Sequence, residues 1–176
     1  MDTIALILHS LSAAVLVGGM VLLFFAVTPA TWLIDDEALR RTVTRVVATR
    51  FAWMTGGALV LLLLTGIYQF TSDTITPPDV RADLMASPFG PIFVTKMALT
   101  VLFVALVGVH GMYFGPRIAR AAEAVLAGGD DEAAWRLTNL RRTSLVFSLV
   151  MLIVAVAVLA LGVTLGNHGY SQVRFD

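Results

Sequence analysis

The sequence of 176 residues lacks cysteine, and this absence excludes disulfide bonds, thiolate metal ligands and catalytic thiols. Charge is also scarce, because Asp, Glu, Lys and Arg make up 14% of the residues, against roughly 25% in an average soluble domain. The 12 basic and 12 acidic residues cancel, so no excess positive charge indicates a nucleic-acid partner. Hydrophobic residues make up 58% of the chain. This composition predicts an integral membrane protein whose main partner is the lipid bilayer.

Several motifs of soluble enzymes are missing as well. The chain has no nucleophile elbow, no glycine-rich phosphate-binding loop and no HExxH metalloprotease motif. All carboxylates lie in connections or at the termini, so we expect no acidic proton relay inside the membrane. The N-terminus has no basic region and no small-residue cleavage site followed by polar sequence, which favours a retained first helix over a cleaved signal peptide. The sequence motifs therefore identify no catalytic residue.

Four apolar stretches are long enough to cross a bilayer, which takes about 20 residues at a rise of 1.5 Å each. They cover residues 4–27, 51–71, 91–115 and 143–166. Pro29 and Pro116 follow the first and third stretches, and we expect these prolines to end the helices. The sequence therefore predicts an all-α fold, in which residues 1–176 form one domain, an antiparallel bundle of four membrane-spanning helices.

The first two connections differ in character. In residues 35–50 hydrophobic side chains recur at helical spacing between arginines, which predicts a short amphipathic helix on the membrane surface. Residues 72–88 contain three prolines and mostly acidic charges, so we expect no regular helix throughout.

The third connection, residues 117–142, carries both basic residues and a glycine pair. It predicts a short helix, a break at Gly128 and Gly129, and a new helix capped at Asp130 or Asp131 that continues into the fourth stretch. Short amphipathic helices are thus expected in both the first and the third connection.

Arginine is concentrated in these same two connections. The second connection holds only Arg81, and the N-terminal residues hold no base. Since positive residues stay on the cytoplasmic side, the first and third connections are predicted to be cytoplasmic and both termini extracytoplasmic. We expect a multi-pass protein of a bacterial inner (cytoplasmic) membrane. The arginines that decide this orientation are Arg40, Arg41, Arg45, Arg50, Arg117, Arg120, Arg136, Arg141 and Arg142.

The first apolar stretch contains one ionisable residue, His9. An ionisable group inside a membrane is costly and usually faces the bundle interior or a cofactor. Lys96 lies at a similar depth in the third stretch, Tyr68 stands at the outer end of the second, and His168 follows the fourth. The outer half of the bundle is therefore expected to gather these four residues. Ser12 follows His9 on the same face of its helix.

His110 belongs to the opposite half of the bundle. It comes 14 residues after Lys96, which places it ~21 Å further along the helix. His9 and His110 are therefore not expected to bind one iron atom. In the cytoplasmic half His110 lies near Met54, and these two residues form a second-ranked pair of metal ligands.

Histidine in a helical bundle is a suitable axial ligand for haem iron. We expect His9 to be the primary ligand and His168 the opposite one, with Lys96 at the haem propionates and Ser12 and Tyr68 among the cofactor contacts. Structural histidines held by hydrogen bonds are the alternative for each site. Copper is the competing metal, since imidazole and thioether both bind it, although the methionines are scattered without a Met-x-x-Met or His-x-His cluster.

Three segments of the chain resemble a known membrane family. They are LHSLSAAVLVGGMVLLF, RFAWMTGGALVLLLLTGIYQF and SPFGPIFVTKMALTVLFVALVGVHGMYFGPRIAR. Together they resemble the CopD-type copper-resistance membrane domain, and their layout is similar to that of the HemJ-type four-helix membrane proteins. The second resemblance implies a haem b held by the first-span histidine, here His9, and a functional lysine in the third span, here Lys96.

The combined expectation is a membrane protein that binds haem b in the extracytoplasmic half of its bundle and takes part in redox chemistry or electron transfer. A haem-dependent oxidoreductase would be one form of it, supplied by a membrane or periplasmic electron donor. CopD-like copper transport or resistance and a cofactor-free membrane assembly protein are the alternatives. Small residues along the spans permit close helix packing and hence a homodimer.

Overall fold

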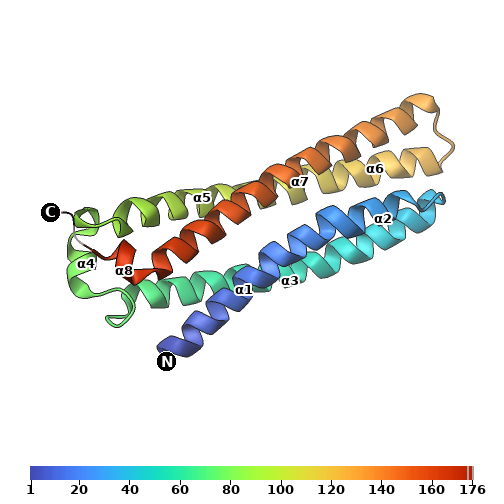
Figure 1. Ribbon diagram of the computed structural model, residues 1–176. Coiled ribbons are helices and arrows are strands. Elements are labelled where there is room, and N and C mark those ends of the chain that lie inside the picture. Colours follow the sequence, from blue (N-terminus) through green and yellow to red (C-terminus); the bar gives the residue numbers. More distant parts are fainter. Residues whose placement is uncertain (174, 176) are drawn as a thin grey trace.

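The computed structural model describes residues 1–173 and 175, and four long helices dominate it (Figure 1). The first consists of α1 (Asp2–Leu22), a π-helical segment η1 (Leu23–Val27) and α2 (Thr28–Trp32). The second is α3 (Glu37–Thr71). The third consists of α5 (Phe89–Val109), a π-helical segment η3 (His110–Phe114) and α6 (Gly115–Leu126), and the fourth is α7 (Asp131–Gly166). Each is long and apolar enough to cross a membrane.

Three short elements complete the chain. Between α3 and α5 lie α4 (Pro78–Ala82) and a 3₁₀ turn η2 (Leu84–Ala86), and α8 (His168–Ser171) follows α7. The expected absence of a regular helix throughout residues 72–88 is therefore confirmed. In Figure 1 these short elements and both chain ends lie at one end of the molecule, and the turns after α2 and after α6 lie at the other.

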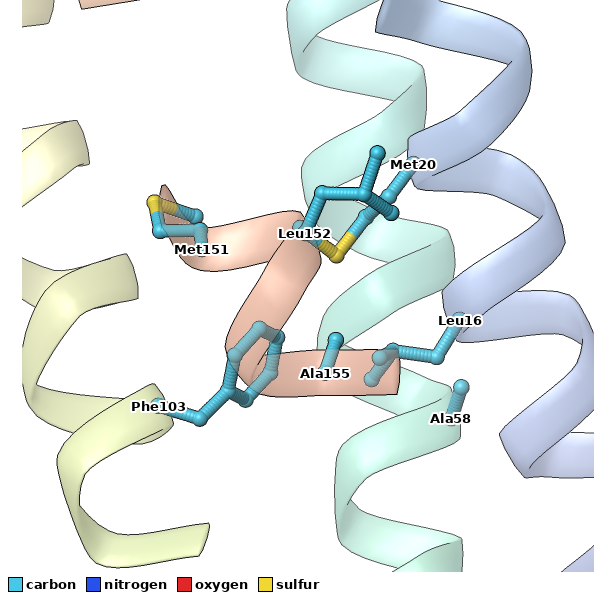
Figure 2. Packing of buried hydrophobic residues seen from close by; sticks show 7 residues of the cluster. All are labelled: Leu16, Met20, Ala58, Phe103, Met151, Leu152 and Ala155. Carbon is cyan, nitrogen blue, oxygen red and sulfur yellow. The ribbon is translucent and has the colours of Figure 1, made fainter. Parts of the chain in front are cut away.

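The four long helices form two hairpins. In the first, α1 packs along α3, and in the second, α5 packs along α7, while α1 also contacts α7 across the molecule. Side chains from all four helices meet in the middle, as Figure 2 shows. Two of them are the alanines Ala58 and Ala155, whose small side chains let the helix backbones approach closely. The cluster consists of Leu16, Met20, Ala58, Phe103, Met151, Leu152 and Ala155.

Aspartates cap the second helix of each hairpin. The carboxylate of Asp36 accepts hydrogen bonds from the backbone N–H groups of Ala38 and Leu39, at 2.8 and 3.3 Å, and Asp130 accepts one from Ala133 at 3.0 Å. Before Asp130, Gly128 adopts φ +87°, a conformation that glycine reaches without strain. The predicted glycine break and the aspartate cap are confirmed.

The helices are longer than the sequence predicted. Pro29 and Pro116 do not end the first and third helices, because each stands in the first turn of the helical segment that follows a π-helical segment. A proline is tolerated there, since its missing N–H is not needed in a first turn. Residues 37–50 are helical as expected, but they continue without a break into the second apolar stretch and form no separate surface helix.

The first long helix of each hairpin repeats one design at an interval of 87 residues. Helices α1 and α5 both have 21 residues, and a π-helical segment of five residues follows each of them. Adding 87 to Asp2, Leu22 and Val27 gives Phe89, Val109 and Phe114, the corresponding bounds in the second hairpin. The first long helices of the two hairpins therefore share one plan up to the end of the π-helical segment.

Candidate functional site

His9 lies in α1, and its half-buried ring faces α3. The Nδ1 atom of His9 is 2.9 Å from the hydroxyl oxygen of Thr65, a buried residue of α3. On the same side, a Cβ atom added to Gly66 would lie 3.5 Å from Cε1 of His9. The imidazole therefore rests on the glycine backbone of α3, and its edge is fixed by one side-chain hydrogen bond.

The hydrogen bonds of Thr65 decide which nitrogen of His9 carries the proton. The Thr65 hydroxyl has one hydrogen, and it donates this hydrogen to the carbonyl oxygen of Leu61 at 2.6 Å. Toward His9 the hydroxyl oxygen then accepts, so this network favours Nδ1 as the protonated nitrogen of His9. The lone pair of Nε2 is left free, which is the arrangement that metal-binding histidines usually have.

Lys96 is a half-buried cation in the apolar part of α5. Its Nζ atom would lie 3.5 Å from a Cβ atom added to Gly162 of α7, so it packs against its partner helix much as His9 does. The ion pairs among residues 1–173 and 175 do not include Lys96.

Ser12 and Tyr68 occupy different surroundings. Ser12 is buried in α1, on the stripe that continues with Leu16 and Met20. Tyr68 is exposed, and its hydroxyl donates to a carboxylate oxygen of Asp2 at 2.8 Å. This bond ties the first residue of α1 to the last turn of α3. Tyr68 follows Thr65 by three residues, so it stands about one helical turn further out on α3 than the partner of His9.

His168 is the first residue of α8 and is exposed. The short helix that carries it is anchored by Ser171, which is fully buried and donates its hydroxyl hydrogen to the carbonyl oxygen of Leu165 at 3.0 Å. His168 therefore lies at the end of the molecule where the chain termini are, as expected (Figure 1).

His110 opens the π-helical segment η3 and is half-buried. Its ring stacks on Phe147 of α7, with centroids 5.9 Å apart, and lies 5.6 Å from the ring of Phe114. Its Nδ1 atom is buried and has no hydrogen-bond partner among the described residues. Met54, in contrast, packs over Gly19 of α1 in the first hairpin. The contacts of His110 thus lie in the second hairpin and those of Met54 in the first.

Across residues 1–173 and 175, no group of three or more His, Asp or Glu side chains is arranged to hold a metal ion. A haem iron needs no such group, because the porphyrin supplies four nitrogens and the protein supplies only the axial ligands.

Sequence reasoning missed the partners of the two polar residues. Thr65 and Gly162 were not singled out as members of a site, although Thr65 stands directly before Gly66 near the end of α3. The available signal was depth, because His9 lies near the start of α1 and Thr65 near the end of the antiparallel α3. Comparisons of the chain with protein-family models, with curated proteins and with solved structures find no match.

Proposed function

We propose that this chain is an integral membrane protein that binds a b-type haem between the outer halves of its helices and uses it in redox chemistry or electron transfer. The observation that carries the proposal is the state of His9: Thr65 holds its Nδ1–H, and the Nε2 lone pair is free for a metal.

The residues around His9 fit the needs of a haem. Gly66 offers no side chain beside the ring, so the imidazole lies directly against the backbone of α3. Lys96 has the same position in α5 that His9 has in α1, and a cation of this kind pairs with a propionate carboxylate. Haem would supply one-electron chemistry there, and the protein would set its potential through the axial ligand and the low polarity of the surroundings.

His168 is the proposed second axial ligand, because it belongs to the outer end of the molecule. If α8 brings this ring over the haem face opposite His9, the iron is closed to other ligands and electron transfer is the function. If it does not, one iron position stays open for a diatomic gas or a substrate. The electrons would come from a membrane or periplasmic donor.

The proposed setting is the bacterial inner membrane, with the four helices as an antiparallel bundle. The apolar windows of the long helices are at most 17% buried, so their outer faces are available to lipid. The helix segments next to the turns after α2 and after α6 hold most arginines. These turns lie at one end of the molecule, and the termini lie at the other (Figure 1). With arginine on the cytoplasmic side, both termini would be extracytoplasmic and the His9 region would lie in the outer leaflet.

An absorption spectrum of the purified protein tests this proposal. Protein expressed with ample haem is expected to show a Soret band, which His9→Ala should abolish and His110→Ala should preserve. In the reduced state, carbon monoxide should shift the band if one iron position is open and leave it unchanged if His168 fills that position. A colourless wild-type protein that binds copper instead, or a Soret band that survives His9→Ala, would overturn the assignment.

A further inference from the structure

A cavity of about 670 Å³ lies between the start of α6 and the first turns of α7, in the second hairpin. Its apolar part is formed by Phe114 and Leu140, and its polar part by Arg117, Arg136 and Asn139. Trp135, which is 65% exposed, stands at its edge. The groove thus combines apolar side chains with two guanidinium groups.

The two arginines are held in different ways. The guanidinium of Arg117 lies 3.6 Å from the centre of the Tyr113 ring, which fixes its position while leaving its hydrogen-bond donors largely unused. Arg117 forms no ion pair with a carboxylate among the described residues. Arg136 pairs with Glu132 at 2.5 Å, but both side chains are about two-thirds exposed, at 67% and 65%. Such an exposed pair is weak and can exchange partners.

The level of the cavity along the helices matches a lipid headgroup. Phe114 and Thr143 stand at the inner ends of the third and fourth apolar stretches, whereas Arg136 comes seven residues before Thr143, which places it ~10 Å beyond the apolar stretch. Exposed Tyr113 and Trp135 are the residue types that gather at membrane–water interfaces. The apolar side of the groove therefore lies at the level of acyl chains, and the guanidinium groups lie at the level of phosphates.

The first hairpin has a groove in the corresponding place, and its lining is apolar. That cavity, of about 310 Å³, is lined by Ala26, Val27 and Ala30 among others. These residues come 87 positions before Tyr113, Phe114 and Arg117, which is the interval of the repeat. A groove is thus present in both hairpins. Among the described residues, arginines line only the groove of the second hairpin.

We infer that the groove between α6 and α7 binds the headgroup of an anionic phospholipid. The phosphate lies between Arg117 and Arg136, and an acyl chain covers Phe114 and Leu140. Basic pockets between membrane helices on the cytoplasmic side bind anionic headgroups in this way. The inference rests on the proposed membrane insertion and orientation, and it is independent of haem.

Native mass spectrometry of the full chain in mild detergent, titrated with phosphatidylglycerol, tests the inference. One lipid is expected to remain bound to the wild type, and Arg117→Ala should weaken its binding about tenfold, the loss of one charge-assisted hydrogen bond. Arg120→Ala is the matched control: it removes an arginine of α6 that does not line the cavity, and it should leave binding unchanged. Glu132→Gln should strengthen binding, because it frees Arg136 for the phosphate.

Three results would overturn the inference. One is an Arg117→Ala protein that binds the lipid as the wild type does, and another is equal loss in the Arg120→Ala protein. The third is full displacement by glycerol 3-phosphate or equal retention of phosphatidylcholine, since the site would then recognise free phosphate or any lipid. Arg117 is exposed, so its substitution should not change the thermal unfolding midpoint in lipid-free detergent. That measurement separates lost lipid binding from misfolding.

Discussion

His9 and Lys96 occupy the same position in the two hairpins: each comes seven residues after the first residue of a 21-residue helix. Each also packs against a glycine of the partner helix, His9 against Gly66 and Lys96 against Gly162. The repeat therefore places an imidazole and an ammonium group at the same position along the first helix of each hairpin. This arrangement gives the proposed haem pocket one side that ligates iron and one side that neutralises carboxylates.

Thr65 should control haem affinity without touching the cofactor. Replacing it by valine keeps the side-chain volume but removes the hydroxyl that accepts the Nδ1–H of His9. Loss of such a bond behind a metal ligand typically lowers affinity 10–100-fold, so we expect Thr65→Val to need ~10–100 times more free haem for half-saturation. Absorbance titration with haem measures this. Thr65→Ser, which keeps the hydroxyl, should bind nearly as the wild type does. Equal affinity in Thr65→Val and the wild type would show that the bond does not support a ligand.

The orientation in the membrane can be tested because the chain has no cysteine of its own. A single cysteine at Thr74, an exposed residue at the end of the molecule where the termini lie, should react with a membrane-impermeant maleimide added to intact spheroplasts. A single cysteine at Asp35, in the exposed turn before α3, should react only after the membranes are opened. The reverse pattern would invert the proposed topology, and labelling of both residues in intact spheroplasts would refute membrane spanning.

The parts of the fold that depend on local chemistry followed from the sequence. Apolar length predicted four long helices, and Gly128 with Asp130 predicted the turn into α7. The continuation of the helix through Pro29 was not predicted. A π-helical segment precedes the proline and places it in the first turn of a new helical segment, where proline is tolerated. No single-sequence pattern shows that wider turn.

Of the candidate site, the sequence predicted the ionisable side chains but not their partners. His9 and Lys96 were recognisable as ionisable residues in apolar stretches, and the equal spacing of 20 residues from His9 to Pro29 and from Lys96 to Pro116 could have shown the repeat. The bond between His9 and Thr65 joins residues 56 positions apart, and it depends on how α1 rotates against α3. Depth alone does not fix that rotation. The hydrogen bond between His9 of α1 and Thr65 of α3 could therefore not be predicted from the sequence.

Glu37 should be the main electrostatic link between the two hairpins. Its carboxylate accepts two hydrogen bonds from Arg141 of α7, at 2.6 and 3.1 Å, and it also pairs with Arg40 at 3.3 Å. The Glu37 and Arg141 side chains are 16% and 24% exposed, between a surface pair worth under ~1 kcal/mol and a buried pair whose disruption costs ~3–5 kcal/mol. We expect Glu37→Gln to lower the free energy of unfolding by about 2 kcal/mol.

Chemical denaturation in detergent, followed by circular dichroism, measures this effect. The control is Glu132→Gln, which breaks the exposed pair with Arg136 and should change the stability by less than ~0.5 kcal/mol. If both variants are equally stable, the Glu37–Arg141 pair does not hold the hairpins together.

Gly90 should be the glycine that tolerates a side chain least. It lies in the first turn of α5, and a Cβ atom there would stand 2.1 Å from the carbonyl oxygen of Leu84 and 2.6 Å from its carbonyl carbon. The clash is with backbone, so no side-chain rotation relieves it, and overpacking of this kind costs ~1–3 kcal/mol or more. Gly90→Ala should therefore lower the thermal unfolding midpoint by roughly 10 °C, since ~1 kcal/mol shifts the midpoint of a chain of this size by ~2–4 °C.

Gly56 provides the matched comparison within α3. A Cβ atom at Gly56 meets nothing within 4 Å, and alanine is favoured over glycine in a helix by about 1 kcal/mol. Gly56→Ala should therefore raise the midpoint by a few degrees or leave it unchanged, while Gly90→Ala lowers it. Because both substitutions add one methyl group to a helix, propensity alone predicts stabilisation in both. Opposite signs would show that the close contact between α5 and the Leu84 backbone decides the result, and equal stabilisation would show that this contact yields without cost.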